Sequence, residues 1–248
     1  MKVISLGWGV QSFTLAAMAA LGELEHVDAA IHADTRHESI LTYQFAERFT
    51  GWLEEMGVKV ITVSDKSSDR VLAGEMIPAF TSSPAGENGQ AFRTCTQRWK
   101  IAPIRRWLQA NRKGEQVEMW LGISLDEYQR MKDSEVKYIT NRWPLIEKHM
   151  TREDCEVWLI KNGLKVPPKS ACTFCPYHNT KEWRRIKAQP KDWEEAVIVD
   201  RMIRKARPPY DLFVHPSRKP LEEVDLRTQE EKGQLSFWDQ ECSGICGV

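Results

Sequence analysis

Cysteine spacing is the feature of this sequence that points most directly to chemistry. The chain holds six cysteines, and Cys172 and Cys175 form a Cys-x-x-Cys pair on a loop bounded by prolines. Two thiolates at that spacing can share one metal ion or two irons of a cluster. With Cys95 from far upstream they provide three thiolates, which suits a 4Fe–4S cluster with one iron open to substrate. With His178 as a further ligand, the pair would instead suit structural zinc, so both kinds of metal site stay open.

A second candidate site is the glycine turn between a first apolar strand, predicted over residues 2–6, and an alanine-rich helix over residues 12–21. Two glycines permit close approach of the backbone to a ligand, and the first amide groups of a helix can receive an anion. A tight turn that binds no ligand would use the same residue types. The candidate nucleotide-binding residues in this turn are Ser5, Gly7, Trp8, Gly9, Gln11 and Ser12.

Polar residues also follow two later predicted strands at the point where each strand ends. Asp34 and Thr35 come after residues 27–32, and the carboxyl ends of parallel strands face the ligand crevice of an open sheet. Gly122 lies at the end of a strand predicted over residues 117–123. Three candidate catalytic residues come next, although the same residues would also form an ordinary acidic helix start with a basic partner: Asp126, Glu127 and Arg130.

Two more cysteines lie near the C-terminus. Cys242 and Cys246 can each be interpreted as a nucleophile, a persulfide carrier, a resolving thiol or a further metal ligand. The alternative is a tail in which these thiols have no role. Cys155, by contrast, lies on a predicted amphipathic helix and is interpreted as a small buried side chain.

The elements that must position these residues alternate between strand and helix. After the first strand and helix come a strand over residues 27–32, a helix over residues 40–56 and a strand over residues 58–63. Strands that alternate with helices pair in parallel through right-handed crossovers. We therefore predict an α/β fold with an open, doubly wound parallel sheet.

The chain is predicted to divide into two regions. Residues 1–125 should form the nucleotide-binding α/β domain, and residues 126–248 a smaller, mainly helical region that carries the Cys-x-x-Cys loop and the tail. Residues 78–92, rich in Ser, Gly, Pro and Asn, are predicted to be a lid or binding loop without regular structure.

Composition excludes several classes of protein. With 42% apolar residues the chain can bury a sizeable core, so a disordered class is excluded. Its 35 basic and 35 acidic residues cancel, which argues against binding nucleic acid by bulk charge. No apolar run approaches the roughly 20 residues of a membrane span, and the N-terminus lacks signal-peptide architecture. Cysteines without a secretion signal indicate reduced thiols, so we expect a cytoplasmic protein with no membrane partner.

A local nucleic-acid contact is still compatible with this balance of charge. Trp107 and Trp183 each stand beside a pair of arginines, and Trp99 and Trp193 also lie among basic residues. Such residues can stack on bases and neutralise phosphates. Helical amphipathicity, with tryptophan packed inward and arginine outward, explains the same pattern equally well.

In order along the chain, these motifs resemble those of the PP-loop ATP pyrophosphatase and phosphoadenylylsulfate (PAPS) reductase superfamily. The resemblance includes the glycine turn, the Asp-Thr pair after the second strand, Cys95, a Gly-Ile segment with Glu127, and the Cys-x-x-Cys pair. The family loop reads Ser-x-Gly-Gly-x-Asp-Ser, and Gln11 at the Asp position is similar to the reductase-like branch. The resemblance implies a bound iron–sulfur cluster and ATP with magnesium, or a related adenine nucleotide.

The reaction that this resemblance implies is adenylation of an acceptor followed by sulfur transfer. Adenylylsulfate reductases carry a Cys-Cys pair upstream, in which Cys95 matches the second member and Thr94 replaces the first, and this departure favours a sulfurtransferase. The alternative enzyme is a PAPS or adenylylsulfate reductase in which Cys242 attacks the sulfonucleotide and a thioredoxin-like protein restores the thiol. The third reading is a non-catalytic, zinc-stabilised module that binds nucleotide or nucleic acid. Expected partners are an adenine nucleotide, a tRNA or DNA acceptor and a sulfur donor, and a homodimer is a compatible assembly.

Overall fold

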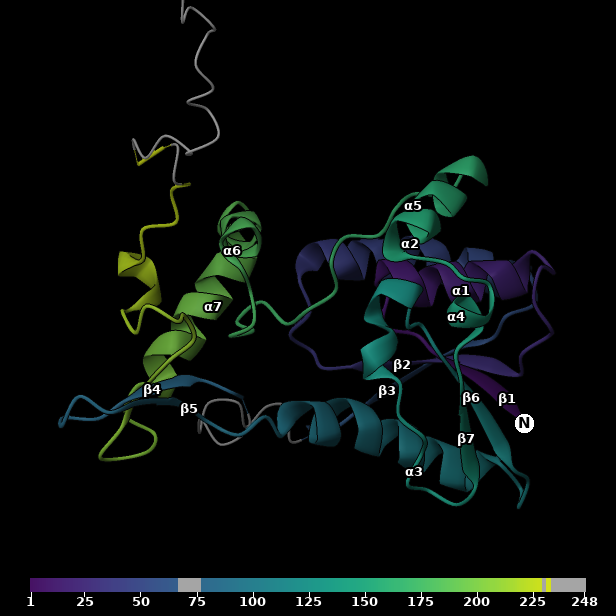
Figure 1. The fold of residues 1–248 in the computed structure, drawn as a ribbon, viewed down its shortest axis with the longest axis horizontal. Helices are drawn as coiled ribbons and strands as arrows, with labels where there is room; N and C mark the ends of the chain where they lie inside the picture. The colour runs from purple at the N-terminus through teal and green to yellow at the C-terminus, as the bar shows by residue number, and fades with distance from the viewer. Residues whose placement is uncertain (67–76, 229–230, 233–248) are drawn as a thin grey trace, which may run out of the picture.

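The computed structural model describes residues 1–66, 77–228 and 231–232. The described residues form two lobes that lie side by side, as Figure 1 shows. The first lobe is built on a parallel sheet, and the second on a small antiparallel sheet with two helices. Cys242 and Cys246, the two tail cysteines singled out from the sequence, lie outside the described residues.

The parallel sheet confirms the predicted fold class. Its strands run in the order β3-β2-β1-β6-β7, all parallel, so the chain starts in the middle and winds outward in both directions. The strands are β1 (Lys2–Ser5), β2 (Ala29–Asp34), β3 (Val60–Ser64), β6 (Val117–Leu121) and β7 (Ile139–Arg142). In a sheet that reverses its winding beside β1, the carboxyl ends of the central strands border a ligand crevice.

Helices cover both faces of this sheet because successive residues of each strand point to opposite sides. One face packs against α1 (Val10–Ala20), α2 (Ile40–Glu55), α4 (Pro144–Glu147) and α5 (Arg152–Lys161). The other face packs against α3 (Ala102–Asn111). Ile4 belongs to the first of these cores and its neighbour Val3 to the second. Cys155 on α5 is fully buried in the first core, as predicted.

The second lobe combines a hairpin from before α3 with the C-terminal part of the chain. Strands β4 (Phe80–Ser82) and β5 (Asn88–Gln90) form an antiparallel sheet with β8 (Asp211–Phe213), in the order β5-β4-β8. Helices α6 (Thr180–Lys187) and α7 (Pro190–Ile203) pack on it, and Trp99, Phe174 and Trp183 fill its core. The expectation of an irregular loop over residues 78–92 was therefore wrong, because its backbone pairs with a strand far along the chain.

The lobes do not separate at residue 125. Strand β7 and helix α5 follow that point and still belong to the first lobe, whereas the β4–β5 hairpin precedes it and belongs to the second. A π-helical turn (Thr96–Ile101) leads back from the hairpin into α3. A 3-10 helix (Leu125–Arg130) joins β6 to β7, and another (Leu221–Glu223) lies on the second lobe. The chain thus crosses between the lobes more than once.

A buried carboxylate ties the second lobe to the first. Asp192 in the first turn of α7 accepts a hydrogen bond from the hydroxyl of Ser39 at 2.6 Å and another from the backbone amide of Ile40 at 3.1 Å. Ser39 and Ile40 form the start of α2, so a residue of one lobe caps a helix of the other. In the part of the chain described, no helix is long and apolar enough to cross a membrane.

Candidate functional site

The glycine turn after β1 forms a rigid loop in front of α1. The Ser12 hydroxyl accepts a hydrogen bond from the amide of Gly7 at 3.1 Å and donates one to the carbonyl of Gly9 at 3.3 Å. Gly9 occupies the N-cap position of α1, and no side chain caps the first turn. The first amide groups of α1 therefore have no side-chain acceptor, which leaves them suited to an anion. We call residues 5–12 the phosphate loop.

Trp8 holds this loop in place rather than facing a ligand. Its backbone lies in the left-handed region, with a φ of 55°, where a bulky side chain is strained. Its ring is buried against Phe13, His32 and Phe45, and this packing offsets the strain. The role of Trp8 that the structure supports is to anchor the turn, with only its backbone near the loop surface.

Gly122 permits a close approach, but the group that approaches is the protein's own backbone. A Cβ atom at this position would lie 2.6 Å from the amide nitrogen of Ser12 and 2.9 Å from the carbonyl carbon of Gln11. The end of β6 therefore packs directly against the backbone of the first turn of α1. Glycine is required at position 122 because any larger side chain would collide with the backbone of α1. From the sequence, Gly122 was expected to lie next to a nucleotide instead.

Gln11 links the phosphate loop to the segment after β6. Its buried side chain accepts a hydrogen bond from Arg152 at 3.1 Å and donates one to Ser124 at 3.3 Å. The amide thus takes part in the support of the loop, and its nearest partners are protein groups. Both ends of this amide are therefore satisfied by protein groups on either side of the loop.

The three residues expected to be catalytic lie beside the loop, and each has a protein partner. Asp126 accepts a hydrogen bond from the amide of Arg152 at the start of α5, and bonds from Ser124 and this amide lower the pKa of its carboxyl. Glu127 and Arg130 form an exposed ion pair. For Glu127, these contacts match the alternative of an acidic helix start with a basic partner one turn later. Arg130 also lines a cavity at the carboxyl edge of the sheet.

This cavity, of about 340 Å³, opens at the carboxyl ends of β1 and β6, on the α3 side of the sheet. Its volume lies within the range of small-molecule sites, roughly 300–1,000 Å³. Ser5, the last residue of β1, lines it directly before the phosphate loop. Apolar side chains and charges of both signs share its wall: Ile101, Ile104, Leu108, Met119, Leu121 and Ile139, with Arg105, Arg130, Lys132, Asp133 and Glu135. We call it the sheet cavity.

Asp34 and Thr35 stand at the end of β2, where they meet the second lobe. The Asp34 carboxylate accepts hydrogen bonds from the Tyr43 hydroxyl at 2.8 Å and from the amide of Arg36 at 2.7 Å. Burial and the neighbouring Asp34 carboxylate raise the pKa of Tyr43. The Thr35 hydroxyl lies 3.3 Å from the Sγ atom of Cys172. The strand end predicted to face a nucleotide therefore also contacts the predicted metal site.

The three predicted cysteine ligands lie on one cavity between the lobes. Cys95, Cys172 and Cys175 line a cavity of about 140 Å³ together with Thr35, Lys100 and Ser170. They come from the start of the π-helical turn and from the loop before α6, so the fold joins residues about 77 positions apart in the chain. We call this the cysteine pocket.

An ion pair between a buried carboxylate and a partly exposed lysine lies next to this pocket. The Glu38 carboxylate is fully buried, and it accepts hydrogen bonds from Lys100 and from the Ser170 hydroxyl, both at 3.0 Å. Burial lowers the pKa of Lys100, but the Glu38 carboxylate and the Cys172 thiol outweigh it, so the net shift is upward. No sequence pattern points to Lys100 or Ser170 as site residues, because their common partner lies far away in the chain.

The thiols themselves need a neutralising partner in this setting. Burial raises the pKa of Cys172, and the Glu38 carboxylate adds to the increase. Burial also raises the pKa of Cys175. A buried thiolate is costly, so each sulfur must carry either a proton or a bound cation.

His178, the fourth predicted ligand, has protein partners at both ring nitrogens. Its Nε2 atom lies 2.8 Å from the carbonyl oxygen of Cys172, and its Nδ1 atom lies 3.5 Å from the Glu182 carboxylate. Its ring is buried against Trp183. His178 therefore supports the Cys-x-x-Cys loop from behind, and we leave it out of the proposed ligand set.

The cysteine pocket offers three sulfur donors, which are the ligands that iron–sulfur clusters use. Within residues 1–66, 77–228 and 231–232, no three His, Cys, Asp or Glu side chains are close enough to hold one metal ion. An iron–sulfur cluster is larger, and thiolates are the ligands it uses. Trp99, which lines the pocket, has a buried Nε1–H group that finds no partner among the described residues, and such a donor can bond a cluster sulfur.

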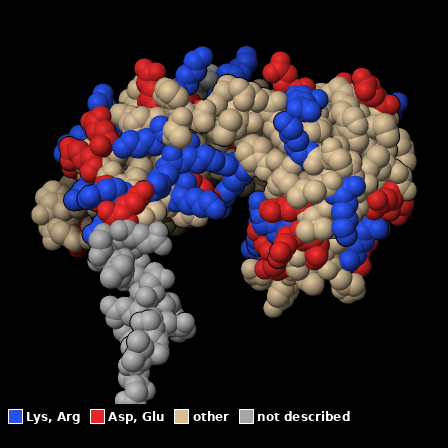
Figure 2. All heavy atoms as spheres, turned by 90° about the horizontal axis from the view of Figure 1, so that it is seen from above, with Lys and Arg blue, Asp and Glu red and all other residues tan. Residues whose placement is uncertain are grey.

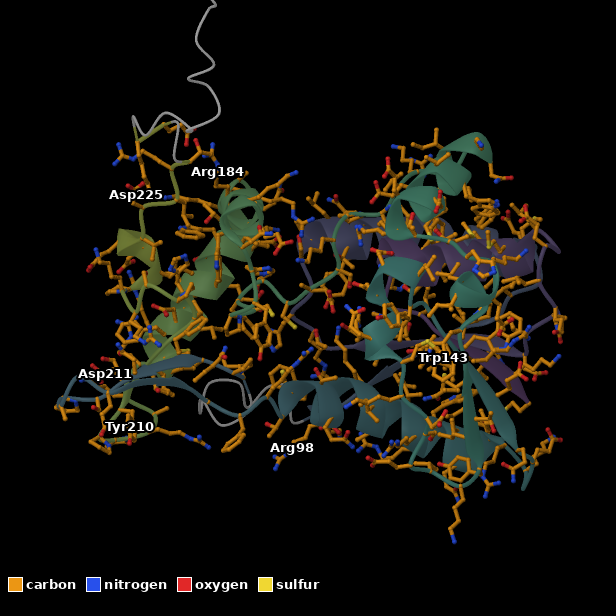
Figure 3. All side chains as sticks on the ribbon, in the orientation of Figure 1. Arg98, Trp143, Arg184, Tyr210, Asp211 and Asp225 are labelled. Carbon is orange, nitrogen blue, oxygen red and sulfur yellow. The ribbon has the colours of Figure 1, made fainter. Side chains whose placement is uncertain are left out.

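The tryptophans do not form the stacking surface considered from the sequence. Trp99 and Trp183 are 1% and 0% exposed, so neither ring can stack on a base. Trp107 and Trp193 are only half-buried and pack against apolar cores. The amphipathic-helix alternative is therefore confirmed for Trp183, with Arg184 beside it exposed, as labelled in Figure 3.

Comparisons with known proteins give a likeness in structure only. No family model matches the chain, and no curated protein matches it. Among solved structures, it is similar to the phosphoadenylyl-sulfate (PAPS) reductase of Candida auris, crystallised as a phosphate complex. The two share 11% sequence identity, and the match covers 67% of this chain and 74% of that chain with a TM-score of 0.46. The likeness is therefore one of fold, over about two thirds of this chain.

Proposed function

We propose that this protein is a PP-loop enzyme of the PAPS-reductase-like type, which binds an adenine nucleotide at the phosphate loop and transfers sulfur at the cysteine pocket. One observation carries the proposal: the two sites adjoin. The Cβ of Ser170, which lines the cysteine pocket, lies 4.0 Å from where a Cβ on Gly9 of the phosphate loop would be. The Thr35 hydroxyl at the end of β2 lies 3.3 Å from the Cys172 Sγ atom, so the carboxyl end of a central strand also borders the cysteine pocket.

The nucleotide would lie across the carboxyl ends of β1 and β6. Its base and ribose would enter the sheet cavity, whose apolar wall suits a flat ring. Its phosphates, with magnesium, would meet the first amide groups of α1, and these groups would stabilise the charge that develops when pyrophosphate leaves. Ser12, Gln11 and Gly122 would hold the loop in position.

The proposed reaction has two steps. The carbonyl oxygen of an acceptor attacks the α-phosphorus of ATP, the bond to pyrophosphate breaks, and the acceptor oxygen becomes part of an AMP leaving group. A sulfur atom supplied by a donor then attacks the acceptor carbon, and AMP departs with the oxygen and the bonding electron pair. Cys95, Cys172 and Cys175 would hold an iron–sulfur cluster, which when bound supplies a place for inorganic sulfide beside the acceptor.

The first test is the metal content of protein purified without oxygen. We expect brown protein with about four irons per chain and matching acid-labile sulfide. Cys172→Ser should lose this colour, and Cys155→Ala, a change in the first-lobe core, should keep it. Colourless protein with stoichiometric zinc would contradict the cluster and favour a zinc-stabilised binding module.

The second test addresses the phosphate loop. Gly9→Asp places a carboxylate at the anion site and should abolish ATP binding by calorimetry and pyrophosphate release. Gly9→Ala is the matched control, because its Cβ would meet only Ser170, at an ordinary contact distance. Equal ATP binding by Gly9→Asp and Gly9→Ala would refute the assignment of this loop. Sulfite release from a sulfonucleotide, in place of pyrophosphate release from ATP, would identify a reductase instead.

A further inference from the structure

The cysteine pocket is lined by an exposed tyrosine and an arginine, and an exposed phenylalanine precedes that arginine in the chain. Tyr177, two residues after Cys175, lines the pocket and is 51% exposed. Phe92, at the end of the β4–β5 hairpin, is 86% exposed, more than any other large apolar side chain of the described residues. Arg93 follows it and places its guanidinium 5.3 Å from the centre of the Tyr177 ring. Exposed aromatic rings beside an arginine offer faces on which a flat ligand ring can stack and a cation that can pair with its anion.

The charges that line this pocket favour an anionic ligand. Two cations, Arg93 and Lys100, line the cysteine pocket, and none of its described lining residues is acidic. Lys100 is paired with Glu38, whereas neither Arg93 nor Arg98 has a carboxylate partner among the described residues. The chain as a whole is neutral, so two cations without an acidic lining residue are a local excess of positive charge. On the face of the molecule seen in Figure 2, Lys and Arg side chains gather on the second lobe beside the notch between the lobes.

The size of the pocket indicates that most of the ligand lies outside it. A cavity of about 140 Å³ is smaller than the roughly 300 Å³ of a site that encloses a whole small molecule. It has room for one reacting group beside the thiols. The remainder of an acceptor must rest on the rim, where Phe92, Arg93 and Tyr177 are the exposed side chains.

We propose that Phe92, Arg93 and Tyr177 form a stacking platform for a base of a single-stranded nucleic acid, which presents that base to the cysteine pocket. The assignment rests on the proposed function, since it names the acceptor class of the same site. Base stacking on aromatic rings and neutralisation of phosphates by arginine are the two interactions that bind single strands, and both are available here. The position of Arg93 over Tyr177 is the one that a stacked base would take, so Arg93 would move from the ring to a phosphate when the strand binds.

The test is binding of short, dye-labelled single-stranded RNA and DNA of mixed sequence, followed by fluorescence anisotropy. Phe92→Ala and Tyr177→Ala should each weaken binding by about 5- to 150-fold. Arg93→Gln should reduce the slope of log affinity against log salt by about 1. Tyr210→Ala is the matched control and should bind as the unchanged protein does. Tyr210 is also exposed but lies at the outer end of the second lobe, away from Arg98 and the lobe junction (Figure 3).

The outcomes separate this proposal from the proposed function. ATP binding, measured in the same samples, should be unchanged in all four variants, because none of these residues lines the sheet cavity. Loss of oligonucleotide binding with intact ATP binding supports the platform. The platform is overturned if the unchanged protein binds no oligonucleotide. It is also overturned if the Phe92, Tyr177 and Tyr210 variants bind the oligonucleotide equally well. Slower reaction of these variants with thioredoxin, without any oligonucleotide binding, would assign the rim to a protein partner and also overturn it. Failure to bind ATP would count against the proposed function alone.

Discussion

Replacement of Gly122 by alanine tests how the sheet supports the phosphate loop. The added methyl group would lie 2.6 Å from the Ser12 nitrogen, whereas ordinary contact begins near 3.4 Å, so the overlap is about 0.8 Å. The neighbouring atoms belong to backbone on both sides, so neither can rotate away. Overpacking of this kind costs about 1–3 kcal/mol of the free energy of unfolding. The start of α1 must move by a comparable fraction of an ångström.

That movement should also reduce nucleotide binding. Hydrogen bonds to phosphate weaken steeply when donor and acceptor separate by most of an ångström. Loss of one bond to a charged group costs about 1.5–3 kcal/mol, which is roughly a 10- to 150-fold weaker affinity for ATP. Gly122→Ala should therefore show both a lower midpoint in urea denaturation and weaker ATP binding by calorimetry.

Gly51→Ala provides the matched control for the same chemical change. Gly51 lies in the middle of the exposed side of α2, with nothing within 4 Å of an added Cβ. Alanine there should stabilise the protein by up to about 1 kcal/mol and leave ATP binding unchanged. If Gly122→Ala bound ATP as tightly as Gly51→Ala and unfolded at the same urea concentration, the steric account of this contact would be refuted.

Three further predictions concern stability. Asp192→Ala should lower the free energy of unfolding by about 1.5–3 kcal/mol in urea titrations, since the hydroxyl of Ser39 loses a charged acceptor; an unchanged midpoint would contradict the capping of α2 by the second lobe. Burial lowers the pKa of His32 from 6.5, so the unfolded chain binds its proton first and stability is lost as pH falls through about 6.5. His32→Asn should show a shallower loss between pH 7.5 and 5.5 in pH-dependent melting curves, and an equally steep loss would exclude this group as a cause. Asn179→Ala removes the N-cap of α6 and should lower the free energy of unfolding by about 0.5–2 kcal/mol in the same urea assay. An unchanged free energy would mean that water replaces the cap.

The parallel sheet could be predicted because its signals are local. The helix expected over residues 40–56 is observed as Ile40–Glu55, and the strand expected over residues 58–63 as Val60–Ser64. Each was visible as a run of apolar residues with its own periodicity. The hairpin of β4 and β5 was missed because its partner β8 lies more than a hundred residues later, and short polar strands such as Asn88–Gln90 carry no apolar pattern.

The candidate site was predicted in its residue types more than in its contacts. The order of the motifs predicted that Cys95 and the Cys-x-x-Cys pair share one site, and all three cysteines line one pocket in the structure. The reason for Gly122 could not be read from the sequence, because a steric contact between distant backbones leaves no local mark. Glu38 and Lys100 were not paired for the same reason, since such an ion pair depends on the meeting of two elements from different parts of the chain.

The path of the chain between the lobes has a consequence for how this protein is made. Strand β4 lies between β5 and β8, so one edge of the hairpin has no partner until the ribosome has synthesised Asp211–Phe213. Cys95 emerges early, whereas the loop that carries Cys172 and Cys175 and the strand that completes their lobe emerge much later. Folding of the second lobe therefore waits for the synthesis of β8, and it depends on long-range contacts that form slowly. Any cofactor held by the three thiols can be inserted only after the chain has been synthesised beyond Cys175, which separates cofactor loading from the folding of the first strands.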